Sequence, residues 1–156
     1  MEDWLVTDER AELVAKIRRT ARQQFGVQPR AGSASLDDVR VDAEPVVHTS
    51  RMTYGYRIQL GESMAAWAPE FLEFPEWAAG AQVMFADAAS WNHPIRFAKG
   101  VGGHAAALDV AEAAQAMNVA RLVFVHVGRS TIRALDAGNS FPFGELGQEG
   151  VKYELA

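Results

Sequence analysis

The stretch from Val119 to Val127 constrains the fold of this chain more than any other part of the sequence. It reads Val-Ala-Arg-Leu-Val-Phe-Val-His-Val, so apolar and β-branched residues follow one another almost without a polar interruption. A strand with one face in solvent alternates apolar and polar residues, whereas a strand buried on both faces reads as a continuous apolar run. We therefore expect this stretch to be the central strand of a sheet covered on both sides.

Three other segments have a clear periodicity. Residues 53–60 alternate apolar and polar side chains, which predicts a half-buried strand. Residues 105–117 are rich in alanine and place Leu108, Ala111, Ala114 and Met117 on one side, which predicts a helix. Residues 8–25 carry apolar side chains at helical spacing, which predicts an N-terminal helix.

These elements predict an α+β (mixed α/β) fold in a single domain over residues 1–156, without a linker. We expect a central sheet that is mostly antiparallel or mixed, with the N-terminal helix and a second long helix at about residues 104–118 packed on it. A chain of this length buries about two thirds of the surface that its unfolded form exposes, so one hydrophobic core is expected.

The remaining segments predict shorter elements. Pro45 interrupts the valine-rich residues 39–47, which fits two short strands or one interrupted strand. Proline also interrupts the aromatic residues 62–79, where we expect two or three short helical turns. We further expect residues 82–86 and 94–98 to pair as strands, residues 131–135 to return from the central strand as an antiparallel hairpin, and residues 151–155 to form an edge strand.

Charge and composition exclude several classes of protein. The formal net charge is −5, which argues against a surface that coats nucleic acid, since phosphate neutralisation needs an excess of Lys and Arg. The absence of cysteine excludes disulfides, thiolate metal sites and a cysteine nucleophile, and it favours a cytoplasmic location. The acidic N-terminus and the lack of a long apolar run predict neither a signal peptide nor a membrane span. The preference for Ala, Arg and Val over Lys and Ile is typical of proteins encoded by GC-rich prokaryotic or phage genomes.

A glycine-rich turn precedes the second predicted helix. Gly100-Val101-Gly102-Gly103-His104-Ala105 forms a G-x-G-x-x-A pattern, in which backbone donors could hold a phosphate, and Arg129 could face a 2′-phosphate. The pattern lies late in the chain, whereas a dinucleotide fold places it near the start of several βαβ units. We therefore interpret it as a glycine-rich loop and a helix start, and its ligand, if it has one, stays open.

Two of the four histidines lie in similar local patterns. His48-Thr-Ser and His126-Val-Gly resemble the paired His-x-Ser or His-x-Thr strands of two-histidine phosphoesterases, although Gly128 replaces the second hydroxyl. The resemblance implies a base and an acid that act on a phosphodiester. His126 also shares its predicted strand face with Leu122 and Phe124, which favours a hydrogen-bonded histidine of the core.

A wider resemblance concerns the order of elements. A first helix, strands, a later helix and a buried strand, together with the Arg, Gly-Ser and Asp of residues 30–38, are similar to the PD-(D/E)xK nucleases, including archaeal Holliday junction resolvases. The resemblance implies that Asp38 and Lys99, with Asp87 as a possible substitute carboxylate, hold Mg²⁺ and orient a water. Phe97 stands two residues before the lysine, where the family has an acid.

A basic stripe follows the predicted N-terminal helix. With the apolar residues of this helix facing inward, four of its basic residues lie on one side and a fifth lies nearby: Lys16, Arg18, Arg19, Arg22 and Arg30. Such a stripe could bind phosphates of a nucleic acid. A solvated helix face, balanced by the acidic remainder of the chain, is the interpretation we favour.

Large apolar residues gather in the segment that proline interrupts. They are Met64, Trp67, Phe71, Phe74 and Trp77. A series of this kind is more often core than cofactor site, but so many large side chains on short turns are difficult to bury in a small domain. The part that stays exposed would form a surface for binding another protein.

The sequence therefore favours a non-enzymatic binding or assembly module, such as a phage or mobile-element structural subunit, an immunity-type inhibitor or an adaptor. Its partner would be another protein or a second copy of itself, as a homo-oligomer, with no membrane and no cofactor. The alternative is a phosphodiester-cleaving enzyme that uses Mg²⁺ with Asp38, Asp87 and Lys99, or His48 and His126 without metal. Only the alternative implies nucleic acid as a partner.

Overall fold

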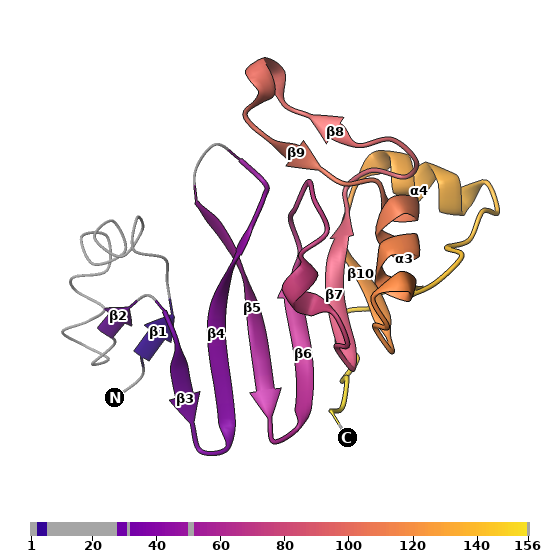
Figure 1. The fold of residues 1–156 in the computed structure, drawn as a ribbon. Coiled ribbons are helices and arrows are strands. Elements are labelled where there is room, and N and C mark those ends of the chain that lie inside the picture. The colour runs from indigo at the N-terminus through magenta and orange to yellow at the C-terminus, as the bar shows by residue number, and fades with distance from the viewer. Residues whose placement is uncertain (1–2, 6–27, 31, 50–51, 156) are drawn as a thin grey trace.

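The architecture is a mixed seven-stranded sheet with two α-helices at one end, in a computed structural model that describes residues 3–5, 28–30, 32–49 and 52–155 (Figure 1). In spatial order the strands are β11 (Glu145–Leu146), β10 (Leu122–Val127), β7 (Val83–Ala88), β6 (Ser63–Ala68), β5 (Thr53–Leu60), β4 (Val39–Val46) and β3 (Ala34–Leu36). The predicted α+β fold with a mixed sheet is thus confirmed.

The sheet has an antiparallel half and a parallel half. Strands β3, β4, β5 and β6 pair as an antiparallel meander, whereas β6, β7, β10 and β11 run parallel. Parallel neighbours need a crossover between them, and helices supply the crossovers that enter and leave β10. Because β6, β7 and β10 run in one direction, their carboxyl ends meet at the same edge of the sheet.

Two small sheets accompany the main one. Strands β1 (Asp3–Leu5) and β2 (Gln28–Arg30) pair in parallel. Strands β8 (Ile95–Arg96) and β9 (Gly103–His104) pair antiparallel and form an arm that projects beyond the edge of the main sheet (Figure 1). The tip of the arm is the 3₁₀ turn η2 (Ala98–Gly100), in which Lys99 has a φ of 64°. A second 3₁₀ turn, η1 (Glu76–Ala78), lies between β6 and β7.

The hydrophobic core lies between the parallel strands and α3 (Ala107–Ala116). The helix contacts β7 and β10 with small side chains, which let its axis approach the sheet closely. Facing it are Ala66 of β6, Met84 of β7 and Leu122 of β10, which the strand register places side by side. The helix α4 (Arg129–Asp136) follows β10 and contributes the buried Thr131, whose hydroxyl donates to the Ala88 carbonyl at 2.7 Å.

The opposite face of the sheet is also apolar. The register aligns Tyr56, Trp67, Phe85 and Val123 in one row across β5, β6, β7 and β10. Within the described residues, the helices α3 and α4 lie at the β7–β10 end of the sheet, and no helix of this part of the chain lies beside β3 to β5 (Figure 1). This face borders the candidate site described below.

Three predicted elements agree with the structure. The apolar stretch forms strand β10, the alternating segment is β5 with the predicted bounds, and the second long helix is α3. The expected central position is wrong, because β10 lies beside the short edge strand β11. The valine-rich segment forms one continuous strand, β4, in spite of Pro45. Proline has no N–H to donate, and Pro45 pairs with Tyr54 near the strand end, where the loss of one hydrogen bond is tolerated.

Four predicted elements are wrong. Residues 131–135 belong to helix α4, since β10 pairs only with parallel strands in the described sheet and a hairpin would require an antiparallel return. Residues 63–68 form β6 rather than helical turns, because β5 and β7 pair with this segment on both sides, and within the predicted segment the turn η1 at residues 76–78 is helical. Residues 83–88 and 95–96 are strands, but they pair with other strands instead of with each other. The last strand is β11, and residues 151–155 form no strand.

Two expectations concern residues 6–27, which lie outside the described part of the chain. They are the N-terminal helix and the basic stripe of Lys16, Arg18, Arg19 and Arg22. Arg30, the fifth member of the stripe, ends strand β2. Among the helices that the structure does describe, none has the length and apolar character needed to cross a lipid bilayer.

Candidate metal centre

Five ionisable side chains gather where the parallel strands end. Asp87 lies near the end of β7 and His126 near the end of β10, while Glu70 follows β6 by two residues. His104 ends β9 of the arm, and His48 follows β4. Together these residues, Asp87, His126, Glu70, His104 and His48, are called the His–Asp cluster below.

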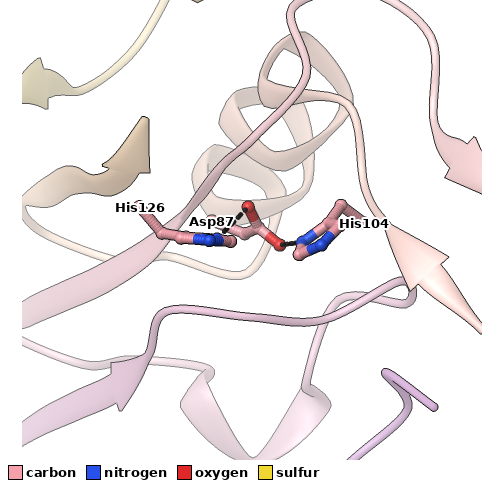
Figure 2. Close-up of side chains that lie close together, drawn as sticks. All are labelled: Asp87, His104 and His126. Atoms are coloured by element: carbon pink, nitrogen blue, oxygen red, sulfur yellow. Dashed lines mark hydrogen bonds and ion pairs between the residues drawn. The ribbon is translucent and has the colours of Figure 1, made fainter. Parts of the chain in front are cut away.

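The carboxylate of Asp87 is fully buried and accepts hydrogen bonds from three donors. Its Oδ2 accepts from the backbone N–H of Phe71 at 3.1 Å and lies 2.6 Å from Nδ1 of His104, and its Oδ1 accepts from the backbone N–H of Ala89 at 2.8 Å. A carboxylate only accepts, so Nδ1 of His104 carries the proton of this bond (Figure 2). This tautomer leaves Nε2 of His104 with a free lone pair.

A β-bulge brings His126 into the cluster. Val125 pairs with Asp87 and Val127 pairs with Ala88, so His126 is the extra residue between them. Its φ of 52° is in the left-handed region, which a non-glycine residue adopts at a cost of about 1–3 kcal/mol. The bulge changes the direction of the side chain, and Nδ1 of His126 lies 3.5 Å from Oδ1 of Asp87 (Figure 2). The prediction of a core histidine is therefore wrong, since 41% of this side chain is exposed.

Glu70 lies between the rings of His126 and His48. Its Oε1 is 3.5 Å from Nε2 of His126, and its Oε2 is 3.4 Å from Nε2 of His48. On the far side of the His48 ring, Nδ1 lies 2.9 Å from the carbonyl oxygen of Gly103. A carbonyl oxygen only accepts, so Nδ1 of His48 donates this hydrogen bond, and Nε2 faces the Glu70 carboxylate.

The three imidazole rings are close neighbours. The centroids of His48 and His104 are 4.7 Å apart, and those of His104 and His126 are 5.0 Å apart. Phe97 of the arm contacts His48 and His104 edge to face, at 5.8 and 5.5 Å. The rings therefore have both polar and apolar partners that hold them in place.

The cluster fits a divalent cation. One ligand atom from each of Asp87, His104 and His126 lies within 4.8 Å of the others, the only such group in the described residues. The contacts of 3.4 and 3.5 Å are longer than hydrogen bonds and resemble the spacing of about 3.3 Å between two ligands of a tetrahedral zinc ion. Neutral imidazoles with a fixed tautomer and an available carboxylate are the donors that zinc and similar metals prefer.

The structure brings together some of the residues that the sequence singled out. Asp87, His48 and His126 meet in the cluster, although the sequence assigned them to different hypotheses. Asp38 lies in the β3–β4 turn, at the opposite end of the sheet from the arm (Figure 1). Lys99 is exposed at the tip of the arm. The triad of the nuclease hypothesis is thus not assembled.

The aromatic series is distributed over both faces of the sheet. Phe71 is fully buried, while Met64, Phe74 and Trp77 are partly buried against the core. Trp67 points to the opposite face and is 39% exposed.

In the glycine-rich turn, a Cβ on Gly102 would lie 1.8 Å from the carbonyl oxygen of His48, so this glycine permits a close approach of backbones.

Sequence reasoning missed Glu70 and His104 as site residues. The proline-broken aromatic pattern around Glu70 predicts helical turns, so the sequence does not indicate that Glu70 follows a parallel strand. His104 lies in a glycine-rich turn, and no sequence spacing connects it with the other histidines. A useful signal would have been the position of Asp87 and His126 near the ends of two apolar segments, since parallel strands present such residues at one edge.

Comparison with known proteins identifies the fold. No family model and no curated protein matches the sequence. Among solved structures, the chain is similar to the metallo-β-lactamase fold protein YhfI from Bacillus subtilis, with a TM-score of 0.60 and 10% identity over 99% of this chain and 78% of that one. It is also similar to a diphosphatase of the PhnP family, with a TM-score of 0.67 and 16% identity over 98% of this chain and 59% of that one.

A third similar structure is the short form of human tRNase Z, with a TM-score of 0.59 and 11% identity over 81% of this chain and 60% of that one. The chain thus spans between 59% and 78% of the length of these three structures. At such low identity the likeness establishes a shared fold, the metallo-β-lactamase fold.

These findings correct the function expected from the sequence. A non-enzymatic binding module acting through protein contacts is contradicted, because the fold neighbours include a diphosphatase and a tRNase Z and the chain places a His–Asp cluster at the edge of its sheet. The PD-(D/E)xK alternative is wrong as well, because the chain has the metallo-β-lactamase fold and because Asp38, in the β3–β4 turn, lies far from Lys99 at the tip of the arm. The expectation of no cofactor is contradicted as well, because the cluster and the fold point to a metal.

Proposed function

We propose that this chain is a metal-dependent hydrolase whose reaction takes place at the His–Asp cluster. The observation that carries the proposal is the pair of contacts at Nδ1: the Gly103 carbonyl oxygen lies 2.9 Å from Nδ1 of His48 and the Asp87 carboxylate lies 2.6 Å from Nδ1 of His104, which leaves Nε2 of each ring to bind a cation. Support comes from the fold, which the chain shares with a diphosphatase, a tRNase Z and a possible metal-dependent hydrolase.

Each member of the cluster has a distinct role in this proposal. His48, His104 and His126 hold the cation together with Glu70, because Nε2 of His48 and Nε2 of His126 lie 3.4 and 3.5 Å from the half-exposed Glu70 carboxylate and the His104 ring lies beside both of the other rings. Asp87 is already bonded to three donors, so it acts by orienting His104 and by compensating its charge. A cation bound there would polarise the substrate and lower the pKa of a coordinated water.

Metal binding and hydrolysis test the proposal together. The protein is stripped with a chelator and titrated with Zn²⁺ or Mn²⁺ by calorimetry, and the loaded protein is assayed on phosphodiester, diphosphate, ester and amide substrates. We expect one saturable site and metal-dependent turnover of at least one class, both lost in His126→Ala. The matched control is His93→Ala, since His93 is exposed and lies outside the cluster. Equal metal binding by both variants would overturn the proposal.

A further inference from the structure

The side chain of Phe97, on the arm, contacts two members of the His–Asp cluster at once. Its ring centroid lies 5.8 Å from that of His48 and 5.5 Å from that of His104. The centroids of the two imidazoles are 4.7 Å apart, so the three rings form a closed triangle in which each ring contacts the other two. No ring of this triangle can turn without disturbing both of its contacts.

The contacts of Phe97 are both edge to face. Its ring plane makes an angle of 77° with the ring of His48 and of 86° with the ring of His104. Aromatic rings favour this perpendicular arrangement, which stabilises a pair beyond the burial of its surface. The hydrogen bonds at Nδ1 determine which nitrogen of each imidazole stays available, but they permit the ring to tilt about that bond. The Phe97 ring restricts this tilt.

Phe97 is not part of the hydrophobic core. It is half-buried, and among the described residues the rings that it contacts are both imidazoles. By contrast, Phe71 and Phe124 are fully buried within the core. The arm that carries Phe97 projects beyond the edge of the main sheet (Figure 1). The cluster, rather than the core, therefore explains why an aromatic side chain stands at this position.

The tip of the arm holds the backbone of Phe97 on both sides. The Phe97 N–H donates to the Gly102 carbonyl at 2.8 Å, and the Phe97 carbonyl accepts from the Gly100 N–H at 3.2 Å. Between these bonds the chain reverses through Lys99 and Gly100, which have φ values of 64° and 68°. The ring of Phe97 is thus attached to a backbone that the turn fixes.

Gly103 attaches the arm to His48 by two contacts. Its N–H donates to the carbonyl oxygen of His48 at 2.8 Å, and its own carbonyl oxygen lies 2.9 Å from Nδ1 of the His48 ring. The neighbouring Gly102 forms an antiparallel bridge with Thr49. The arm cannot leave the edge of the sheet without breaking these bonds, so Phe97 and His48 keep their relative positions.

From these contacts we infer that Phe97 is a positioning residue of the candidate metal centre. Its ring holds the imidazoles of His48 and His104 at a fixed tilt, so that both rings are ordered before a cation binds. An ordered set of ligands binds more tightly, because less conformational freedom is lost on binding. The inference rests on the proposed function and deepens it, since it gives the arm a role in preparing two ligands of the site.

Metal affinity tests the role of the ring. The affinity for Zn²⁺ is measured in competition with a chromophoric chelator for the parent protein and for Phe97→Ala, Phe97→Leu and Phe97→Tyr. We expect affinity to fall by about tenfold or more in Phe97→Ala and Phe97→Leu and to be retained in Phe97→Tyr, because only tyrosine keeps the ring. Equal affinity in Phe97→Ala and the parent protein, or full affinity in Phe97→Leu, would overturn the inference.

Val101→Ala is the matched control. Val101 is an exposed apolar residue that follows the same turn of the arm, and it has no aromatic ring to contact the imidazoles. We expect Val101→Ala to bind Zn²⁺ as tightly as the parent protein does. If this control loses as much affinity as Phe97→Ala, any truncation in the arm has the same effect, and the specific role of Phe97 is refuted.

Two further measurements separate positioning from a loss of the arm structure. The Gly103 amide, followed by nuclear magnetic resonance, should stay protected from hydrogen exchange in Phe97→Ala, because its acceptor is a backbone carbonyl. The visible absorption of the Co²⁺-loaded protein reports coordination geometry, so it should change in Phe97→Ala and return to that of the parent protein in Phe97→Tyr. Loss of protection at Gly103 in both Phe97→Ala and Phe97→Leu would show that the ring serves the folding of the arm, against the inference.

The outcomes also separate this inference from the hydrolase proposal. If the parent protein binds Zn²⁺ but hydrolyses no substrate, the hydrolase proposal alone fails, and the affinities of the variants still decide on Phe97. If the parent protein binds Zn²⁺ and hydrolyses a substrate while Phe97→Ala binds equally well, only the positioning role fails. A parent protein that binds no metal refutes both.

Discussion

Asp87 and His104 make the shortest contact of the His–Asp cluster, 2.6 Å, although they belong to different sheets and are 17 positions apart in the sequence. Asp87 is part of the central sheet, whereas His104 ends the small sheet of the arm. The contact therefore fixes the arm to the edge of the main sheet. We therefore expect changes that shift the arm to act on the candidate metal centre through this bond.

Asp87→Asn should affect both stability and metal affinity. An amide has one acceptor oxygen, whereas Asp87 receives donors on two oxygens, so at least one buried N–H of Phe71, Ala89 or His104 would face an NH₂ group. We expect a loss of about 2–4 kcal/mol in the free energy of unfolding and a loss of about 10- to 100-fold in metal affinity. Urea unfolding of the metal-free protein and calorimetric titration measure the two effects separately.

Glu70→Gln should lower metal affinity strongly and change the free energy of unfolding very little. The Glu70 side chain is 44% exposed, so its replacement should change the free energy of unfolding by no more than about 0.5 kcal/mol. As a ligand, however, it should lower metal affinity by more than about 100-fold. The same two measurements apply. Retained affinity in Glu70→Gln, with complete loss in Asp87→Asn, would exchange the roles that we assign to the two carboxylates.

The sequence predicted the parts of the fold that depend on local pattern. The apolar stretch of β10, the alternation of β5 and the alanine-rich face of α3 determine their own structure, because burial of these side chains requires it. Helix α4 and strand β6 could not be predicted in the same way. The local pattern of residues 131–135 is compatible with a strand, and only the parallel pairing of β10 requires a helix there. The spacing of Trp67 is compatible with a helix, and only the pairing of its segment with β5 and β7 makes it a strand.

The site was predictable only in part for a related reason. His48, Asp87 and His126 were recognised as chemically able residues, but a spacing of 39 residues between Asp87 and His126 contains no motif. Their proximity follows from parallel pairing of β7 with β10 and from the bulge at His126. A bulge has no period in the sequence, so counting alternate residues along the strand places His126 on the face of Leu122 and Phe124, which is the wrong face.

The backbone strain at His126 can be measured without the metal. His126→Asn and His126→Val both remove the imidazole, but asparagine adopts a positive φ readily and a β-branched valine does not. We therefore expect His126→Val to be less stable than His126→Asn by about 1–3 kcal/mol in chelator-treated protein. Thermal or urea unfolding gives the comparison. Equal stability of the two variants would show that the bulge is absent in solution.

Gly103→Ala should disrupt the arm. A Cβ at this position would lie 1.8 Å from the carbonyl oxygen of Ile95, which is impossible unless β8 and β9 separate. The arm also carries the hydrogen bond from the Phe97 amide to the Gly102 carbonyl, 2.8 Å, so this amide should exchange with solvent much faster in the variant. The control is Gly138→Ala, where a Cβ meets no atom within 4 Å and only the cost of a positive φ remains. Hydrogen exchange read by mass spectrometry compares the two.

A hydrogen bond between Ser33, which precedes β3, and Asp42 of β4 makes the stability of the chain depend on pH in acid. The Ser33 hydroxyl donates to Oδ1 of Asp42 at 2.5 Å, and this bond, together with the neighbouring Arg40, lowers the pKa of the Asp42 carboxyl. A carboxyl whose pKa is lower in the folded state adds stability above its unfolded pKa of about 3.9, and this contribution is lost as the pH falls through the folded pKa.

Ser33→Ala should therefore be less stable than the parent protein at neutral pH, and the difference in the free energy of unfolding should shrink as the pH falls below about 4. Urea unfolding between neutral and acidic pH measures the difference, and nuclear magnetic resonance of the Asp42 carboxyl should show a higher pKa in the variant. Ser35→Ala serves as the control, because Ser35 is an exposed residue of β3. A difference between Ser33→Ala and the parent that stays constant over this pH range would mean that the hydroxyl acts by packing alone, without linkage to the proton on Asp42.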